Sequence, residues 1–122
     1  MTLKELYSDI DASYEQALRV LRIDRLLDKH IRKFATSDVI DSLIEARATM
    51  DAKQLFESAH AAKGICGNLG LTTLASLASQ IAEEFRPGSS RTMGDDEVSR
   101  IIDQISDLYA RTVEGIRRYE QS

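Results

Sequence analysis

At 122 residues, with 43% hydrophobic and 30% charged side chains, the chain has the length and composition of one globular domain. Its net charge of −4 argues against a nucleic-acid partner, because phosphate binding favours a basic surface. No apolar run approaches the ~20 residues that cross a bilayer, and Met1–Asp11 lacks the layout of a signal peptide. The single cysteine, Cys66, suits a reducing compartment. We therefore expect one cytoplasmic, monomeric domain over residues 1–122, with no membrane and no nucleic-acid partner.

Apolar residues recur at helical spacing almost throughout the chain, and helix-favouring residues fill most of it. Residues 1–10 form an N-terminal segment that precedes a short predicted helix over Ala17–Ile23. Asp11 and Ser13 are the candidate N-caps of this helix.

A long second helix is predicted from Asp24 to Ala48. Thr36–Asp38 could cap a new helix within this stretch, but we favour one continuous helix with these residues facing solvent. Asp51 is the expected N-cap of a third helix, Ala52–Leu69, and Gly70 is its expected C-cap glycine. The spacing thus predicts two helices joined by a short connection.

The last part of the chain predicts a fourth helix over Thr73–Phe85, which follows an N-cap at Thr72. Arg86–Asp95 contains the only proline and two glycines and is expected to be a mobile loop. A long final helix covers Asp96–Tyr119. Four amphipathic helices with short connections predict an all-α fold, an antiparallel up-down four-helix bundle with a short extra N-terminal helix.

The third helix separates an apolar side from a polar side. On a wheel of about 100° per residue with His60 at zero, the residues on the opposite side are Leu55, Ser58, Ala59, Ala62, Ile65, Cys66 and Leu69. These residues are the predicted core stripe, so His60 points outward. The face of His60 itself carries Lys53, Phe56, Glu57, Lys63, Gly64 and Gly67.

Two glycines on the solvent side of this helix need a reason, because each costs about 1 kcal/mol relative to alanine. Gly64 and Gly67 leave the backbone bare beside His60, so another macromolecule can approach the imidazole ring. Lys63, one turn after His60, supplies a cation where an anion on the histidine would lie. Each feature alone is ordinary surface or helix packing, but together they indicate a site that carries a phosphoryl group.

The run Ala59–Leu71, AHAAKGICGNLGL, closely resembles the signature of histidine phosphotransfer (HPt) domains, H-x-x-K-G followed by a small residue and a Leu-Gly pair. Asp11–Phe34 also looks like the entry helix and the start of the second helix of that family. This resemblance implies that His60 is phosphorylated, that Lys63 stabilises the phosphoryl group, and that Gly64 gives a receiver domain room.

The sequence departs from the family pattern at one position. Many members have a polar residue 22 positions after the histidine that hydrogen-bonds the imidazole, and here that position is Ala82. Gln80, Glu83 or an ordered water could replace this contact.

The resemblance also implies a mechanism that requires a partner. An exposed histidine is largely neutral at cytoplasmic pH, so His60 can attack phosphorus through a ring nitrogen, which we expect to be Nε2. The chain shows no carboxylate cluster suited to Mg²⁺, no phosphate-binding glycine loop and no kinase motif. We therefore expect a phosphocarrier that binds no cofactor. The Mg²⁺ and the aspartyl phosphate would belong to the receiver domains of response regulators and hybrid sensor histidine kinases, between which His60 would pass the group.

Docking of a receiver domain needs a surface around the histidine. Phe56, one turn before His60, either packs under the first helix or forms part of this surface with Ala61, Gly67 and Leu71. Cys66 is expected in the core and His30 on the surface.

Two other functions share these features. One is a non-catalytic helical adaptor that binds receiver or kinase domains. The other is the phosphate-accepting domain of a chemotaxis-type histidine kinase, which would be a fragment of a longer protein. The first residue, Met1, and the polar ending Gln121–Ser122 favour a complete small protein.

Overall fold

The computed structural model describes all residues 1–122 and contains seven α-helices and no strand. The predicted all-α class is confirmed. None of the helices is both long and apolar enough to span a membrane. The helices are α1 (Leu3–Asp9), α2 (Tyr14–Leu21), α3 (Asp24–Phe34), α4 (Val39–Ala46), α5 (Ala52–Asn68), α6 (Thr72–Glu84) and α7 (Asp95–Gln121).

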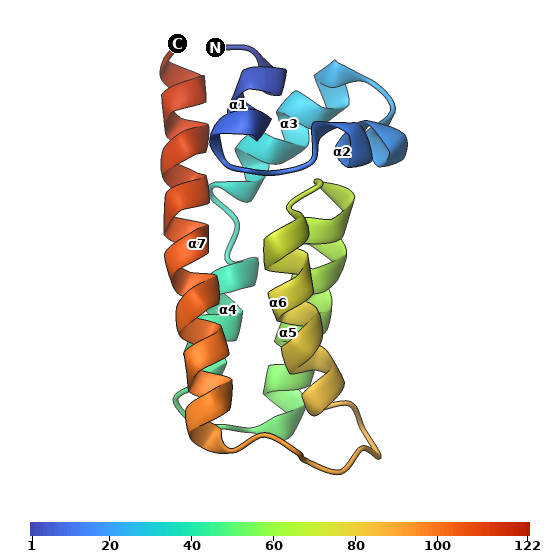
Figure 1. Ribbon diagram of the computed structural model, residues 1–122, viewed down its shortest axis with the longest axis vertical. Helices are drawn as coiled ribbons and strands as arrows, with labels where there is room; N and C mark the ends of the chain where they lie inside the picture. Colours follow the sequence, from blue (N-terminus) through green and yellow to red (C-terminus); the bar gives the residue numbers. More distant parts are fainter.

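The helices form an elongated bundle along α7, the longest of them (Figure 1). α4 packs against α5 and α7, and α6 also packs against α5 and α7, so that these four helices close a ring. The chain runs down α4, up α5, down α6 and up α7, while α1, α2 and α3 cover the upper end (Figure 1). Both termini lie at that end, where the N-terminal amine donates to Ser122 Oγ at 2.9 Å.

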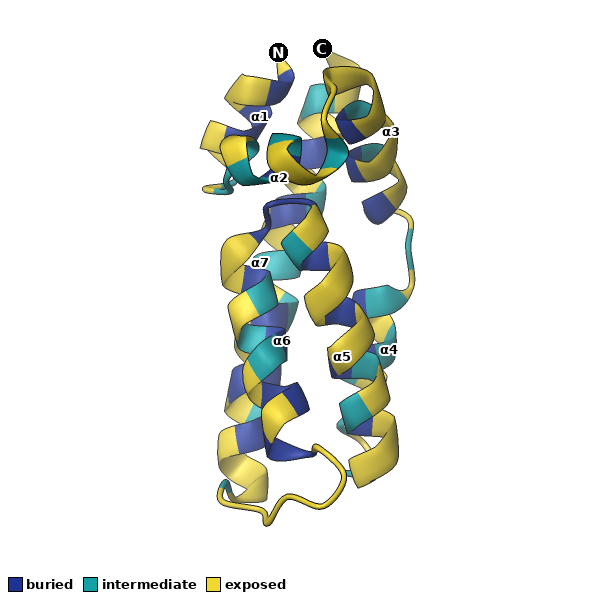
Figure 2. Cartoon of the chain, turned by 90° about the vertical axis from the view of Figure 1, so that its right-hand side faces the viewer, coloured by how far each residue is buried: buried dark blue, intermediate teal, exposed yellow.

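Apolar side chains from every helix form one core, and its residues face the interior of the bundle (Figure 2). The burial of apolar surface is the main force that holds such helices together. The buried hydrophobic residues of α7, Val98, Ile101, Ile102, Ile105 and Ile116, lie at helical spacing along its inner side. α5 and α6 make the most extensive pairing in the bundle, and the candidate site therefore lies on a helix that is well fixed on its inner side.

The N-terminal segment departs from the sequence prediction. It contains a helix, α1, which begins with a capping box between Thr2 and Glu5 and buries Leu6 and Tyr7. Two short helices, rather than one, therefore precede α3. Of the two candidate N-caps of α2, Ser13 is the one used, and its Oγ accepts a hydrogen bond from Gln16 N at 3.1 Å.

The predicted long helix Asp24–Ala48 is wrong, because it is interrupted after Phe34. Ser37 Oγ accepts the backbone N–H of Val39 at 3.2 Å, which starts α4 afresh. Tyr109 of α7 donates its hydroxyl to the carbonyl of Ser37 at 3.3 Å. Its ring packs edge-on against the ring of Phe34, with ring centroids 5.6 Å apart. A side chain far away in the sequence thus stabilises the break.

The connection between α6 and α7 is tied to the bundle by a buried carboxylate. Glu84 accepts hydrogen bonds from the backbone N–H groups of Thr92 and Met93, at 2.7 and 2.8 Å, and from the Thr92 hydroxyl at 2.8 Å. The bond from Met93 is the main reason that the pKa of Glu84 lies below its usual value. The predicted loop is confirmed in position, although α7 already begins at Asp95. The mobility of the loop stays a prediction.

Candidate functional site

α5 begins as its sequence predicts, and most of its predicted core stripe is buried. The carboxylate of Asp51 accepts the N–H groups of Lys53 and Gln54 at 2.9 and 3.2 Å, so it is the predicted N-cap. The fully buried residues of α5 are Leu55, Ala59, Ala62 and Cys66. Burial raises the pKa of the Cys66 thiol to about 12, so this cysteine is a neutral core side chain.

Ile65 was predicted in the core stripe and is instead 40% exposed. It lies at the edge of α5, where no helix covers it, and lines a groove of about 380 Å³ against α2 and α3. Leu21 and Asn68 line the same groove. His30 also lies on this groove, and its predicted place on the surface is confirmed.

His60 lies on the exposed side of α5, which faces the viewer in Figure 2. Its imidazole stacks on the ring of Phe56, with ring centroids 5.5 Å apart and ring planes at 19°. Ala61, Lys63 and Gly64 are also exposed, so the structure brings the predicted acceptor, cation and glycine to one surface.

Lys63 extends from the turn that follows His60. Cα–Cβ bonds of a helix tilt toward its N-terminus, so the Lys63 side chain leaves the backbone in the direction of the His60 turn. Lys63 takes part in none of the ion pairs of the molecule. Its ammonium group is therefore available to an anion on His60.

The three glycines near His60 serve different purposes. A Cβ added to Gly64 or Gly67 would meet no atom within 4 Å, so packing requires neither glycine. Gly70, by contrast, has φ +71°, and a Cβ there would lie 2.1 Å from the carbonyl oxygen of Ser13. Gly70 is therefore a structural glycine that ends α5, whereas Gly64 and Gly67 leave open surface beside His60.

The C-terminal end of α5 is held by the N-terminal helices. Tyr7 of α1 donates its hydroxyl to Leu69 O at 2.6 Å, and Gln16 Nε2 of α2 donates to Gly67 O at 3.1 Å. The backbone N–H of Ser13 donates to Gly70 O at 2.8 Å. These contacts give the carbonyls at and just after the end of α5 additional donors, where the helix itself supplies few. Sequence periodicity gave no signal for them.

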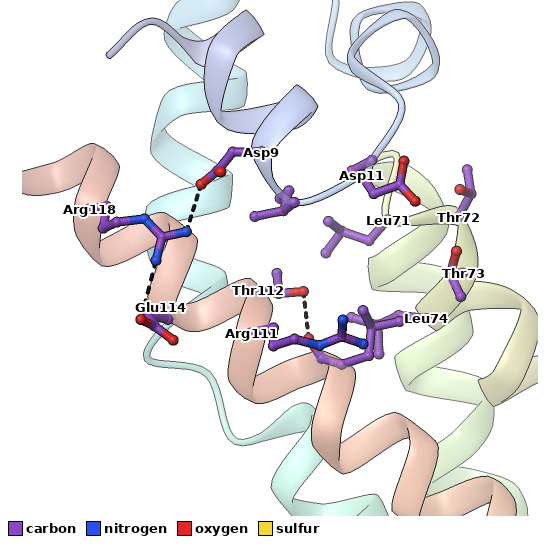
Figure 3. A pocket seen from close by; sticks show the side chains of 13 residues that line it. Asp9, Asp11, Leu71, Thr72, Thr73, Leu74, Arg111, Thr112, Glu114 and Arg118 are labelled. Atoms are coloured by element: carbon purple, nitrogen blue, oxygen red, sulfur yellow. Dashed lines mark hydrogen bonds and ion pairs between the residues drawn. The ribbon is translucent and has the colours of Figure 1, made fainter.

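Leu71 was predicted on the docking surface, and this prediction is wrong. Leu71 is 4% exposed, because it packs at the start of α6 beneath the α1–α2 connection. It points into a cavity of about 450 Å³ that is also lined by Leu74, Arg111 and Thr112 (Figure 3). Neither His60 nor Lys63 lines this cavity, so it is separate from the candidate site.

The other predicted docking residues differ in exposure. Ala61 is exposed, whereas Phe56 and Gly67 are half-buried. Phe56 also packs against the hydrophobic core, but no contact places it under the first helix.

Sequence reasoning missed an apolar part of the surface. The large hydrophobic side chains that the chain leaves exposed include Val20, Ile23 and Leu26, at the corner between α2 and α3, and Ile65. Leu21 connects this corner to the groove that Ile65 lines.

Ala82 provides no polar partner for His60, since it is an apolar side chain that is 3% exposed. Of the two residues considered as replacements, Glu83 pairs with Arg86. No hydrogen bond of the molecule involves the His60 ring, and its defined side-chain contact is the Phe56 ring.

A family model described as Hpt domain matches residues 34–115, about two thirds of the chain. The matched segment contains α4, α5, α6 and most of α7, and with them the whole surface around His60. Searches of curated proteins and of solved structures gave no match.

Proposed function

Because the chain belongs to the Hpt domain family, we propose that it is a phosphocarrier of a two-component phosphorelay that carries the phosphoryl group on His60. Members of this family transfer phosphoryl groups through a histidine and have no kinase activity of their own. The observation that carries the assignment is the exposed His60 beside an unpaired Lys63 and the open backbone at Gly64.

The donor in this proposal is an aspartyl phosphate of a receiver domain. The lone pair of His60 Nε2 forms the new P–N bond while the P–O bond of the aspartyl phosphate breaks. The electron pair of the broken bond stays on the aspartate oxygen and restores the carboxylate. The imidazole proton stays on Nδ1 during the attack. The reverse reaction passes the group to the aspartate of a second receiver. Mg²⁺, which offsets charge on the transferring group, is supplied by the receiver.

Lys63 stabilises the phosphorylated state. The phosphoryl group brings negative charge to a surface where the Lys63 ammonium has no competing carboxylate. Its role is electrostatic, so an uncharged residue of similar length should not replace it.

The receiver domain docks over the exposed side of α5. Gly64 and Gly67 let its backbone approach, and the exposed Ala61 lies beside them. The exposed Ile65 extends this surface toward the groove that separates α5 from α2 and α3. We further propose that the chain acts in the cytoplasm as a monomer.

The decisive experiment incubates the chain with radiolabelled phospho-receiver domains of the same organism and Mg²⁺. We expect an acid-labile, base-stable label that His60→Gln abolishes. His30→Gln is the matched control, because His30 is the only other histidine of the chain. A label that survives His60→Gln would contradict the assignment. Binding to receivers without any label would instead support the non-catalytic adaptor.

The role of Lys63 is tested in the same assay. Lys63→Gln should slow transfer on the order of tenfold, as expected for a lost charge-assisted hydrogen bond. Lys53→Gln makes the same change of charge on the same side of α5, about 10 Å from His60 along the axis in the opposite direction. Equal effects of the two substitutions would show that only the overall charge of the surface matters.

A further inference from the structure

We propose that Phe56 is a positioning residue for phosphoryl transfer, whose ring holds the imidazole of His60 in its reactive orientation. This inference rests on the proposed function of His60 and assigns to Phe56 a role that acts through the histidine. It differs from the docking role considered for Phe56 in the sequence analysis.

The stack follows from the geometry of α5. Phe56 and His60 are four residues apart, so their side chains are neighbours on one face of the helix. Helical side chains point back toward the N-terminus, and the imidazole therefore lies over the turn that holds Phe56. The two ring planes differ by 19°, and the centroids lie 5.5 Å apart, within the range of offset-stacked aromatic pairs.

The imidazole needs such a support because nothing else fixes its plane. Rotation about χ2 of histidine has broad, roughly two-fold minima, so an exposed ring samples many orientations. In this protein no hydrogen bond restrains the His60 ring, and the family's polar position is occupied by the buried Ala82. A parallel ring at stacking distance restrains χ2 by contact instead.

Phe56 can restrain the imidazole because it is itself held. It is half-buried and packs against the hydrophobic core, whereas His60 is exposed. One side of the phenyl ring is thus anchored in the bundle, and the other presents a flat surface to the imidazole. Transfer of a phosphoryl group needs in-line approach, so an imidazole confined to fewer orientations reacts more often on encounter.

The proposal predicts a change in maximal rate and not in binding. Transfer from the phospho-receiver that labels His60 is measured in single-turnover experiments at increasing receiver concentration. Phe56→Leu keeps an apolar side chain against the core but removes the stack. Its maximal rate should fall about two- to tenfold, the factor that corresponds to the energy of an aromatic pair, with an unchanged half-saturating concentration. Phe56→Tyr keeps the stack and should retain the wild-type rate.

Labelling by phosphoramidate tests the intrinsic reactivity of His60, and the half-saturating concentration of the receiver separates positioning from docking. Phosphoramidate, a small donor that needs no docking surface, should label the wild type and Phe56→Leu at similar rates, as its P–N bond breaks and ammonia leaves. If the wild type accepts phosphoryl from neither phosphoramidate nor any receiver, the proposed function itself fails. If Phe56→Leu raises only the half-saturating concentration, Phe56 is a docking residue and the positioning role is refuted.

A measurement on the wild-type protein does not depend on the folding of a variant. The stack predicts nuclear Overhauser contacts between the ring protons of Phe56 and His60, and upfield ring-current shifts of the imidazole protons. An imidazole without these contacts in solution would overturn the proposal.

Discussion

The substitution Gly64→Ala should separate the stability of this protein from its activity. Gly64 lies inside α5, where alanine is favoured over glycine by about 0.8–1.0 kcal/mol. The added methyl group would meet no atom within 4 Å, so no steric penalty opposes this gain. It also buries no apolar surface, and the expected increase in the free energy of unfolding is therefore about 1 kcal/mol. For a domain of this length, that corresponds to an increase of about 3–5 °C in Tm.

The same methyl group should slow transfer from a receiver. It would project into the open strip beside His60, where the docked receiver needs close approach. Overpacking by one methyl group at a well-fitted contact costs about 1–3 kcal/mol, which weakens productive docking roughly 5- to 150-fold. Phosphoramidate, which needs no docking, should label the variant at the wild-type rate.

Urea denaturation followed by circular dichroism measures the first effect, and single-turnover transfer measures the second. A Gly64→Ala variant that is less stable than the wild type would show that packing, and not access, explains the glycine. A variant that is more stable and transfers at the wild-type rate would refute the access argument. Only the combination of higher stability and slower transfer supports it.

Two further substitutions test contacts that support the site. Gly70→Ala should lower the free energy of unfolding by about 3 kcal/mol in urea denaturation, because it adds left-handed strain and a clash with the backbone of Ser13; a loss below about 1 kcal/mol would contradict this. Glu84→Gln should destabilise by about 1–3 kcal/mol and increase hydrogen exchange at Thr92 and Met93, since it weakens their bonds to the carboxylate. Folding lowers the pKa of the Glu84 carboxyl from 4.5. The ionised carboxylate therefore stabilises the folded state above pH 4.5, and this stabilisation is lost as the pH falls through the lower pKa of the folded protein. Acid unfolding of Glu84→Gln should be less steep than that of the wild type, and identical acid transitions would contradict the assignment.

The site was predictable where a single helix determines it. The exposure of His60 follows from the periodicity of α5 alone. The start of the helix follows from Asp51, whose carboxylate can accept backbone N–H groups of the first turn. Lys63 and Gly64 then fall on the same exposed surface, because three- and four-residue spacings are adjacent on any α-helix. None of these inferences requires knowledge of how the other helices pack.

The predictions failed where distant residues decide the outcome. Thr36–Asp38 are compatible with a continuous helix or a break, and the contact of Tyr109 with Ser37 stabilises the break. Ile65 has the spacing of a core residue, but no helix covers that edge of α5. Leu71 was assigned to the surface because the sequence could not show that the α1–α2 connection lies over it.

The N-terminal helices α1 and α2 explain how α5 can carry an open strip. Gly64 and Gly67 together weaken the helix by about 2 kcal/mol, within residues that must keep His60 and Lys63 in register. At the same end of α5, Tyr7, Gln16 and Ser13 donate to the carbonyls of Leu69, Gly67 and Gly70. At about 1 kcal/mol each, these three bonds offset the cost of the two glycines. Because this support reaches α5 at its C-terminal end, the surface beside His60 can stay bare for a partner without loosening the helix that presents the histidine.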